Sequence, residues 1–460
     1  MGAALAQQQV NPSTQKKQKH PPGLYLLFFT ELWERFSYYG MRAILVLYLT
    51  KSFINGGLGF SDSAAVYIYG FFTGAVYFTP LIGGFLSDRF LGRRLAITLG
   101  GITMAIGNLA LFMGQSKLNL YIGLALLIIG NGFFKPNIST LVGELYDVND
   151  KRKDAAFTIF YMGINIGAFF SPLVVGYFTD DLFKTTVNGV EHFGYKFGFL
   201  AAAIGMIVGQ LLFNLLGNKY LGDIGKKPVG KPVKNEAGVK TKTPLTKKEK
   251  QRVAVIFIIT CFVVFFMAGF EQAGSSLTLY TDKFIDRNVF DWTVPTSWFQ
   301  SLNPLFIVIL APILSALWVK LSNTKRGDLA IPTKMGVGLI LLGAGFMVLV
   351  PALLQTSGNS HAKANMIFMV LTYFLHTLGE LCVQPVGLSA VSKLAPIKMA
   401  SLLMGVWLAG SGVANILGGQ LAAFTSQLGY FQVFMLIGSV IIALGLILLL
   451  ISKKLVKMME

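Results

Sequence analysis

The sequence predicts an all-α membrane protein of twelve transmembrane helices. Hydrophobic residues make up 54% of the chain and charged residues only 13%, whereas a soluble domain carries about a quarter charged residues. Long apolar stretches recur from residue 24 to residue 450. Many of them reach the ~20 residues that a helix needs to cross the hydrocarbon core of a bilayer.

Apolar runs bounded by polar turns predict the individual helices. We expect them at 24–53, 63–86, 94–113, 119–146, 155–178, 194–216, 252–284, 298–321, 331–354, 364–394, 400–426 and 430–451. The first 22 residues are polar and contain no apolar run, so they predict a tail rather than a cleaved signal peptide. Cys261 and Cys382 both fall inside expected helices, which predicts no disulfide framework.

A polar segment divides the chain into two halves. Residues 218–251 are rich in Lys, Gly, Pro and Thr, too polar to insert and too poor in apolar residues to fold alone. We therefore expect a tail at 1–23, a six-helix bundle at 24–217, the linker at 218–251, a second six-helix bundle at 252–452 and a tail at 453–460. Two such bundles favour a repeat-built carrier with a site for small solutes near the middle of the membrane.

The basic residues predict the orientation of the chain. Most of the 39 lysines and arginines fall in the tails, the linker and alternate turns. The other side of the membrane receives only Lys51, Lys117, Lys184, Lys196, Lys283, Arg287 and Lys363. The positive-inside rule then places both termini in the cytoplasm of a multi-pass protein in the cell membrane. We interpret the net charge of +18 as this signal, and not as the mark of a nucleic-acid partner.

Seven charged residues remain inside the expected helices: Glu31, Glu34, Arg35, Arg42, Lys135, Glu271 and Glu380. Charges at such depth are costly unless they are paired or hydrated, so they usually mark a polar cavity. On the first helix the charges share one face with Tyr38 and Tyr39, within an arc of about 140° at about 100° per residue. A pair between residues four apart accounts for Glu31 and Arg35 but leaves Arg42 unexplained.

Helix geometry predicts which charges meet. At a rise of 1.5 Å per residue, Arg35 lies ~16 Å from the inner end of its helix, and Lys135 lies at a similar height, beside the two glutamates of the first helix. The same count places Arg42 at ~27 Å and Glu271 at ~29 Å, on helices of opposite halves. An ion pair between those two residues would close the outer mouth.

Glu380 is expected near the middle of its helix, across the cavity from the basic residues. This polarity suits a small zwitterion, with its ammonium near Glu380 and its carboxylate near Arg35, Lys135 and Arg42. The embedded charges sum to −1, so one bound proton would neutralise the site, and proton coupling follows as an expectation. Nearby aromatic residues predict pocket walls, with ordinary helix packing as the equal alternative: Tyr38, Tyr39, Tyr77, Tyr161 and Trp407.

Three motifs carry a family resemblance: ELWERFSYYG at 31–40, GNGFFKPN at 130–137 and FYMGINIG at 160–167. They resemble signatures of the proton-dependent oligopeptide transporter family within the major facilitator superfamily. The turn GGFLSDRFLGRR at 83–94 is similar to the superfamily's loop between its second and third helices. The resemblance spans essentially every helix and continues through QSLNP at 300–304 and LGE at 378–380. It implies a major facilitator fold and proton-driven symport of di- and tripeptides by alternating access.

The resemblance also implies roles for single residues. Proton coupling is assigned to Glu31, Glu34, Arg35, Lys135 and Glu271, and the outer gate to Arg42 and Glu271. The peptide's amino end is assigned to Asn165, Asn303 and Glu380, and its carboxylate to Arg35, Tyr39, Arg42 and Lys135. Pocket positions are Tyr38, Tyr77 and Trp407. The family implies no cofactor or metal beyond the coupling protons, and we expect the chain to act as a monomer.

The linker lacks an apolar run long enough for the two extra helices of many bacterial relatives. The outer turn near residue 360 is too short to hold the extracellular domain of animal relatives. A twelve-helix bacterial-type member is therefore expected.

The alternative functions are a carrier of nitrate, amino acids or drugs, a membrane-embedded enzyme and a passive channel. Glu380 argues against an anion as the cargo. His376 is the one histidine in an expected helix, and no catalytic constellation accompanies it.

Overall fold

The computed structural model describes residues 19–147, 150, 152–228, 245–324, 327–356, 362–396 and 399–459. Within these ranges, eleven helical spans are long and apolar enough to cross a membrane. Helix α1 (Pro22–Thr50) completes the expected twelve. It falls outside the eleven because its charged residues interrupt every long apolar window.

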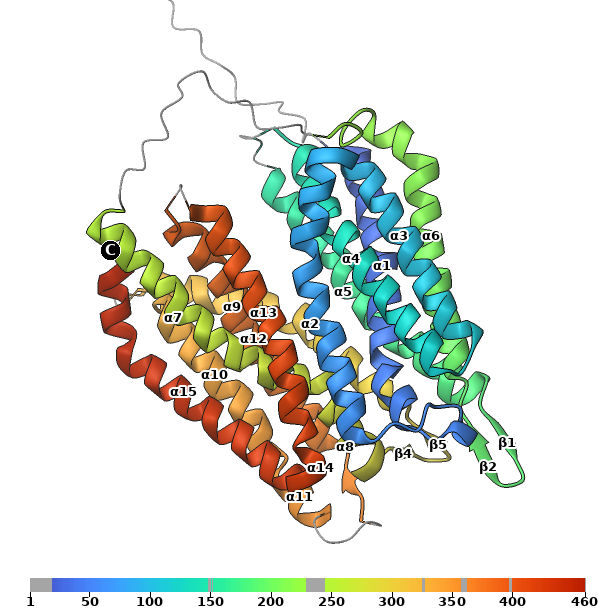
Figure 1. Cartoon of the computed structure of the whole chain (residues 1–460). Helices are drawn as coiled ribbons and strands as arrows, with labels where there is room; N and C mark the ends of the chain where they lie inside the picture. The colour runs from blue at the N-terminus through green and yellow to red at the C-terminus, as the bar shows by residue number, and fades with distance from the viewer. Residues whose placement is uncertain are drawn as a thin grey trace, which may run out of the picture.

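The N-terminal half contains α1 and five further long helices, α2 (Asp62–Leu86), α3 (Arg93–Met113), α4 (Lys117–Glu144), α5 (Lys153–Tyr177) and α6 (Tyr195–Leu221). A 3₁₀-helix, η1 (Phe53–Asn55), follows α1, and π-helical segments continue α2 and α5 as η2 (Ser87–Leu91) and η3 (Phe178–Leu182). Strands β1 (Thr185–Val187) and β2 (Val190–His192) pair antiparallel in a hairpin. One continuous core of buried aliphatic and aromatic side chains joins the six helices, whose arrangement is drawn in Figure 1.

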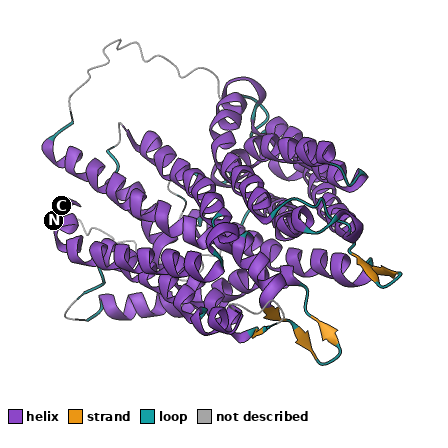
Figure 2. Cartoon of the chain, turned by 60° about the horizontal axis from the view of Figure 1, so that its bottom comes forward, coloured by secondary structure: helices purple, strands orange, loops and turns teal. Residues whose placement is uncertain are grey.

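The C-terminal half builds a second core from six spans, four of which consist of more than one helical segment. These spans are α7 (Lys247–Phe270) with η4 (Glu271–Gly274) and α8 (Ser276–Phe284), η5 (Thr296–Ser301) with α9 (Leu302–Ser322), α10 (Ile331–Val348) with α11 (Val350–Thr356), α12 (Ile367–Leu394), α13 (Ala400–Ala423) with α14 (Thr425–Leu428), and α15 (Tyr430–Met459). Strand β3 (Ile285–Asp286) pairs with β6 (Ala364–Asn365), and β4 (Asn288–Val289) pairs with β5 (Trp292–Thr293). The strands lie outside the helical bundles (Figure 2).

Helix ends depart most from the prediction where a helix runs beyond its apolar segment. Helix α7 begins at Lys247, within the expected linker, because Thr246 caps it. The Thr246 side chain accepts a hydrogen bond from the Glu249 amide, and the Glu249 carboxylate accepts one from the Thr246 amide. Helix α15 continues to Met459, where Arg252 donates to the Met459 carbonyl at 2.9 Å. Apolar length therefore predicted the membrane span but not the whole helix.

The two ends of the molecule differ. We call the end that carries the β1–β2 hairpin the hairpin side, and the end where α6 stops at Leu221 and α7 starts at Lys247 the linker side (Figure 1). Toward the hairpin side the halves meet along α2 and α13, where a side chain at Gly70 would collide with the backbone of Gly419. Toward the linker side the ribbons of the two halves diverge (Figure 1).

Polar contacts between the halves gather on the hairpin side. Lys51 pairs with Asp282 at 2.6 Å, and Lys283 pairs with Asp62. Ser301 donates to the Phe169 carbonyl at 2.8 Å, so α5 and η5 are tied together as well. The structure is therefore held closed between the halves at this end.

Candidate transport site

A buried ion cluster occupies the middle of α1. Glu31, Glu34 and Arg35 are each at most 4% exposed. The Arg35 Nε lies 3.1 Å from Glu31 Oε1 and also pairs with Glu34. Asn131 of α4 donates to Glu34 at 3.4 Å. The predicted pairing of Glu31 with Arg35 is present, and Glu34 joins it, so one guanidinium serves two carboxylates.

Lys135 lies beside this cluster without joining it. Its ammonium is 4.5 Å from the centre of the Tyr77 ring, which is a favourable position for a cation against an aromatic face. In the part of the chain that the structure describes, Lys135 forms no ion pair with Glu31 or Glu34. Lys135 is therefore a neighbour of the Arg35 cluster, as expected, but it is not ion-paired with the two glutamates. Its ammonium is still available to an anionic ligand.

The pair predicted between the halves is present. Arg42 donates to the Glu271 carboxylate through Nη2 and to the Tyr69 hydroxyl through Nε. Helix α7 ends just before Glu271, so this carboxylate stands on a tight turn. A Cβ at Gly274 would lie 1.7 Å from the Tyr69 hydroxyl, so only glycine lets that turn approach α2. The pair links α1 to η4 on the hairpin side of the site.

Asn303 of α9 holds the Glu380 carboxylate of α12 from one side. Asn303 donates to Glu380 Oε2 at 2.7 Å and to the Thr377 hydroxyl at 3.1 Å. Asn165, on α5 of the other half, uses its amide nitrogen to donate to the Tyr161 carbonyl at 3.0 Å. Asn303 therefore orients the Glu380 carboxylate and leaves its second oxygen without a hydrogen bond from Asn303.

A cavity of about 180 Å³ lies between the halves, and at about 10–15 Å³ for each water it has room for several. Predicted residues from both halves line it: Tyr39, Arg42, Tyr77, Asn165, Glu271, Asn303 and Glu380. Lys135 covers the Tyr77 ring, and Tyr77 shares the cavity with Glu380. Arg42 of one half and Glu271 and Glu380 of the other half therefore face one chamber, and Lys135 adjoins it through the Tyr77 ring without lining it.

Two predicted pocket residues lie elsewhere. Tyr38 does not line this cavity and is buried beside Phe72 and Arg35. Trp407 is 3% exposed within the C-terminal core, where a Cβ on Gly387 would lie 2.1 Å from its ring. Helix counting could not tell the cavity face of a helix from its packed face.

The cavity is also lined by uncharged residues that the sequence analysis did not assign to it. Gln300 and Gln384 line the cavity, as do Tyr373 and His376, which lies one helical turn from Glu380. Tyr69 completes the Arg42 contact from α2. Of these, the glutamines offered a usable signal, because uncharged amides inside apolar helices also need polar surroundings.

In the described residues, α1 and eleven spans long and apolar enough to cross a membrane surround a polar, charge-lined cavity between two halves, which defines a membrane transporter of the major facilitator type. Comparison with known proteins identifies the family within that class. Residues 94–237 and 219–433 match the POT family. The chain is 32% identical to a peptide transporter of Yersinia enterocolitica, over 87% of each chain. It is 32% identical to a di-/tripeptide transporter of Lactococcus lactis subsp. cremoris, over 95% of this chain and 96% of the relative.

Solved structures agree. A crystal structure of a peptide transporter POT in complex with sulfate matches with a TM-score of 0.87 and 34% identity, over 96% of each chain. A POT family transporter in complex with 5-aminolevulinic acid matches with a TM-score of 0.85 and 31% identity, over 95% of this chain and 97% of that one. The chain belongs to the POT family, whose motifs it carries, and it is a transporter rather than an enzyme.

Proposed function

We propose that this protein imports di- and tripeptides together with protons, by alternating access to the central cavity. The observation that supports this most directly is the cavity itself. It places the Glu380 carboxylate in one half opposite Arg42 and Tyr39 in the other. A short peptide carries a positive charge at one end and a negative charge at the other, and such a chamber complements both.

The amino end of the peptide is assigned to Glu380, Asn303 and Asn165. Asn303 already holds one Glu380 oxygen at 2.7 Å, so the carboxylate is oriented before a ligand arrives. A peptide ammonium would bind the other oxygen through a charge-assisted hydrogen bond. The Asn165 amide oxygen lies on the facing half and is a second acceptor for the same group.

The carboxylate end is assigned to Arg35, Tyr39, Arg42 and Lys135. Lys135 forms no ion pair among the described residues, so its ammonium can turn from the Tyr77 ring to a peptide carboxylate without breaking one. Arg35 is occupied by Glu31 and Glu34. Protonation of either glutamate would weaken its hold on Arg35 and give the guanidinium to the peptide, which is one route from proton binding to substrate binding.

The second coupling step is assigned to Glu271. Its carboxylate holds Arg42 and thereby ties the two halves together on the hairpin side. A proton on Glu271 would remove the charge that attracts Arg42 and allow this side to open. Tyr38, Tyr77 and Trp407 remain assigned to the pocket wall, and of these only Tyr77 lines the cavity in the closed arrangement of the hairpin side.

The membrane setting is part of the same proposal. The excess of lysine and arginine on the linker side supports a cytoplasmic location for that side and for both termini, in the cell membrane. Both halves of the same chain line the cavity, and the proposal takes a monomer as the functional unit. Protons serve as the coupling ion, and no other cofactor is required.

The proposal is tested in liposomes that contain only the purified protein. With an imposed inward proton gradient, a labelled dipeptide should accumulate above its external concentration, and a protonophore should abolish the accumulation. Dipeptides blocked at the amino or the carboxyl end should compete weakly with the label. If no member of a broad panel of di- and tripeptides accumulates under the gradient, peptide symport is rejected.

Another small solute is the alternative cargo. The structure of a POT family transporter with 5-aminolevulinic acid favours an amino-acid-like zwitterion over nitrate, and the acidic wall at Glu380 agrees with that preference. Gradient-driven uptake of 5-aminolevulinic acid in the absence of any peptide uptake would support this alternative.

A further inference from the structure

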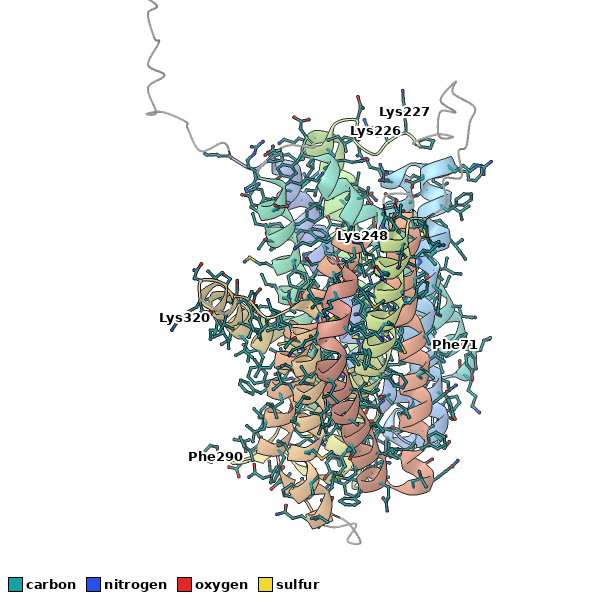
Figure 3. All side chains as sticks on the ribbon, turned by 90° about the vertical axis from the view of Figure 1, so that its left-hand side faces the viewer. Phe71, Lys226, Lys227, Lys248, Phe290 and Lys320 are labelled. Carbon is teal, nitrogen blue, oxygen red and sulfur yellow. The ribbon has the colours of Figure 1, made fainter. Side chains whose placement is uncertain are left out.

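A second crevice opens on the outside of the C-terminal half, away from the transport cavity. Pro312 lies inside α9, where its missing amide and its ring favour a kink. None of the residues from Val308 to Thr324 is buried. In Figure 3 the helix that carries Lys320 stands out from the side of the molecule. The linker-side part of α9 is therefore separated from the bundle.

The space beneath this helix is a crevice of about 370 Å³ between α9, α10 and α12. One wall includes Leu314, Ser315 and Trp318 of α9, and the facing wall includes Val386, Ser389 and Lys393 of α12. The charged residues and Trp318 lie toward the linker-side ends of these helices, while Leu314 and Val386 lie deeper. The crevice is therefore polar and basic at its mouth and apolar farther into the membrane.

Lys334 of α10 sits at this mouth although it is only 8% exposed. Its ammonium lies 2.6 Å from an Asp328 oxygen and 4.5 Å from the centre of the Trp318 ring. Lys393 adds a second ammonium on an exposed position of α12. Two lysines and one aspartate leave the crevice with a net positive charge.

We propose that this crevice binds an anionic phospholipid from the leaflet on the linker side. The lipid phosphate would lie between the Lys334 and Lys393 ammonium groups, with the Ser315 and Ser389 hydroxyls as further donors. Basic pockets between transmembrane helices at the cytoplasmic level suit such headgroups. The deeper apolar walls favour a lipid over a soluble anion, because an acyl chain fills them.

The crevice adjoins the transport site through its own helices. Asn303 of α9 and Glu380 of α12 are hydrogen-bonded to each other, and the crevice separates the same two helices toward the linker side. A lipid there would act as a wedge that sets the angle between α9 and α12. The inference does not depend on the identity of the transported solute.

Native mass spectrometry of the delipidated full-length protein tests the inference. The protein is titrated in detergent with phosphatidylglycerol or with phosphatidylcholine of the same acyl chains, and bound lipids are counted. We expect at least threefold more phosphatidylglycerol than phosphatidylcholine to be retained. Lys393→Gln and Lys334→Gln should each remove most of this preference, whereas Lys454→Gln, an exposed lysine of α15, should not.

Equal retention of the two lipids, or an unchanged preference in Lys393→Gln, would overturn the inference. Displacement of the bound phosphatidylglycerol by millimolar inorganic phosphate would also overturn it, since the site would then belong to a soluble anion. If Lys334→Gln fails to fold, Lys393→Gln and Ser389→Leu decide the question, because both change partly or fully exposed positions of α12.

Discussion

At Glu380, a single carboxylate is oriented by Asn303 to accept a positively charged group of a ligand. Asn303 donates to one of its oxygens, and Asn303 also contacts Thr377 one helical turn below. The amide is thus fixed at two points and in turn fixes the carboxylate. Preorganisation of this kind makes a charged contact selective, because a ligand without a positive end leaves the partly buried carboxylate without a charged partner.

Glu380→Gln should weaken the binding of dipeptides with a free amino end. A hydrogen bond to a charged group contributes about 1.5–3 kcal/mol, which corresponds to a loss of about tenfold or more in affinity. The measurement is the dipeptide concentration that halves uptake of a labelled peptide. Amino-blocked dipeptides should lose much less, and Glu191→Gln, on the exposed hairpin, should change neither value. Equal losses for free and blocked peptides would contradict the assignment.

Glu271→Gln should separate transport from proton coupling. The amide keeps the shape of the side chain but cannot titrate, so the step that opens the hairpin side no longer depends on a proton. We expect gradient-driven accumulation to fall to background while exchange of labelled for unlabelled peptide across the membrane persists. The control is Glu144→Gln, which alters a partly exposed ion pair with Arg93 outside the cavity. Retention of full proton-driven accumulation in Glu271→Gln would show that the carboxylate is not the coupling group.

At the scale of the helices, the sequence predicted the spans because eleven contain a long apolar window and the first, although it carries charges, is otherwise rich in apolar residues. It did not predict where a span is interrupted. The break after Phe270 places Glu271 on a tight turn, yet the local residues remain apolar enough for a continuous helix. The detached part of α9 was missed for a related reason, since composition does not report which lipid-facing helix stands away from its neighbours. Interruptions and separations follow from tertiary contacts.

The crossing of α2 and α13 offers a test of helix packing. A methyl group at Gly70 would lie 2.7 Å from the Gly419 Cα, whereas one at Gly405 of the same helix pair would meet nothing within 4 Å. Gly70→Ala should therefore destabilise the protein by about 1–3 kcal/mol through overpacking. Gly405→Ala should be neutral or slightly stabilising, because alanine favours helix more than glycine does. Thermal unfolding in detergent compares the two, and equal melting temperatures would contradict the close approach.

At the scale of the whole molecule, charged residues both orient the chain in the membrane and form ion pairs between its halves. The lysine and arginine excess on the linker side orients the chain, and its distribution was readable from the sequence because it depends only on position along the chain. Of three ion pairs between the halves, only one could be predicted from the sequence. Arg42 with Glu271 followed from depth within the membrane, but Lys51 with Asp282 and Lys283 with Asp62 join loops and helix ends whose positions depend on the assembled fold.

These two outer pairs should favour closure of the hairpin side. Exposed or partly exposed pairs contribute about 0–1 kcal/mol each, so the loss of both, up to about 2 kcal/mol, should shift the balance of closed and open states by up to about thirtyfold. The measurement uses spin labels at Val187 and Phe290, which are exposed on opposite halves (Figure 3 labels Phe290), in a protein whose two native cysteines are replaced by alanine. Combined Lys51→Gln and Lys283→Gln should increase the population of long distances in double electron–electron resonance.

The matched control for this experiment is Lys184→Gln. Lys184 pairs with Glu191 at 2.6 Å, and both residues belong to the N-terminal half, so the control removes an ion pair near the same end without changing what joins the halves. It should leave the distance distribution unaltered. A shift of equal size in the control would mean that total charge near the hairpin side, and not the pairs between the halves, sets the equilibrium. An unchanged distribution in the double variant would leave closure to Arg42 with Glu271 and to the apolar contact of α2 with α13.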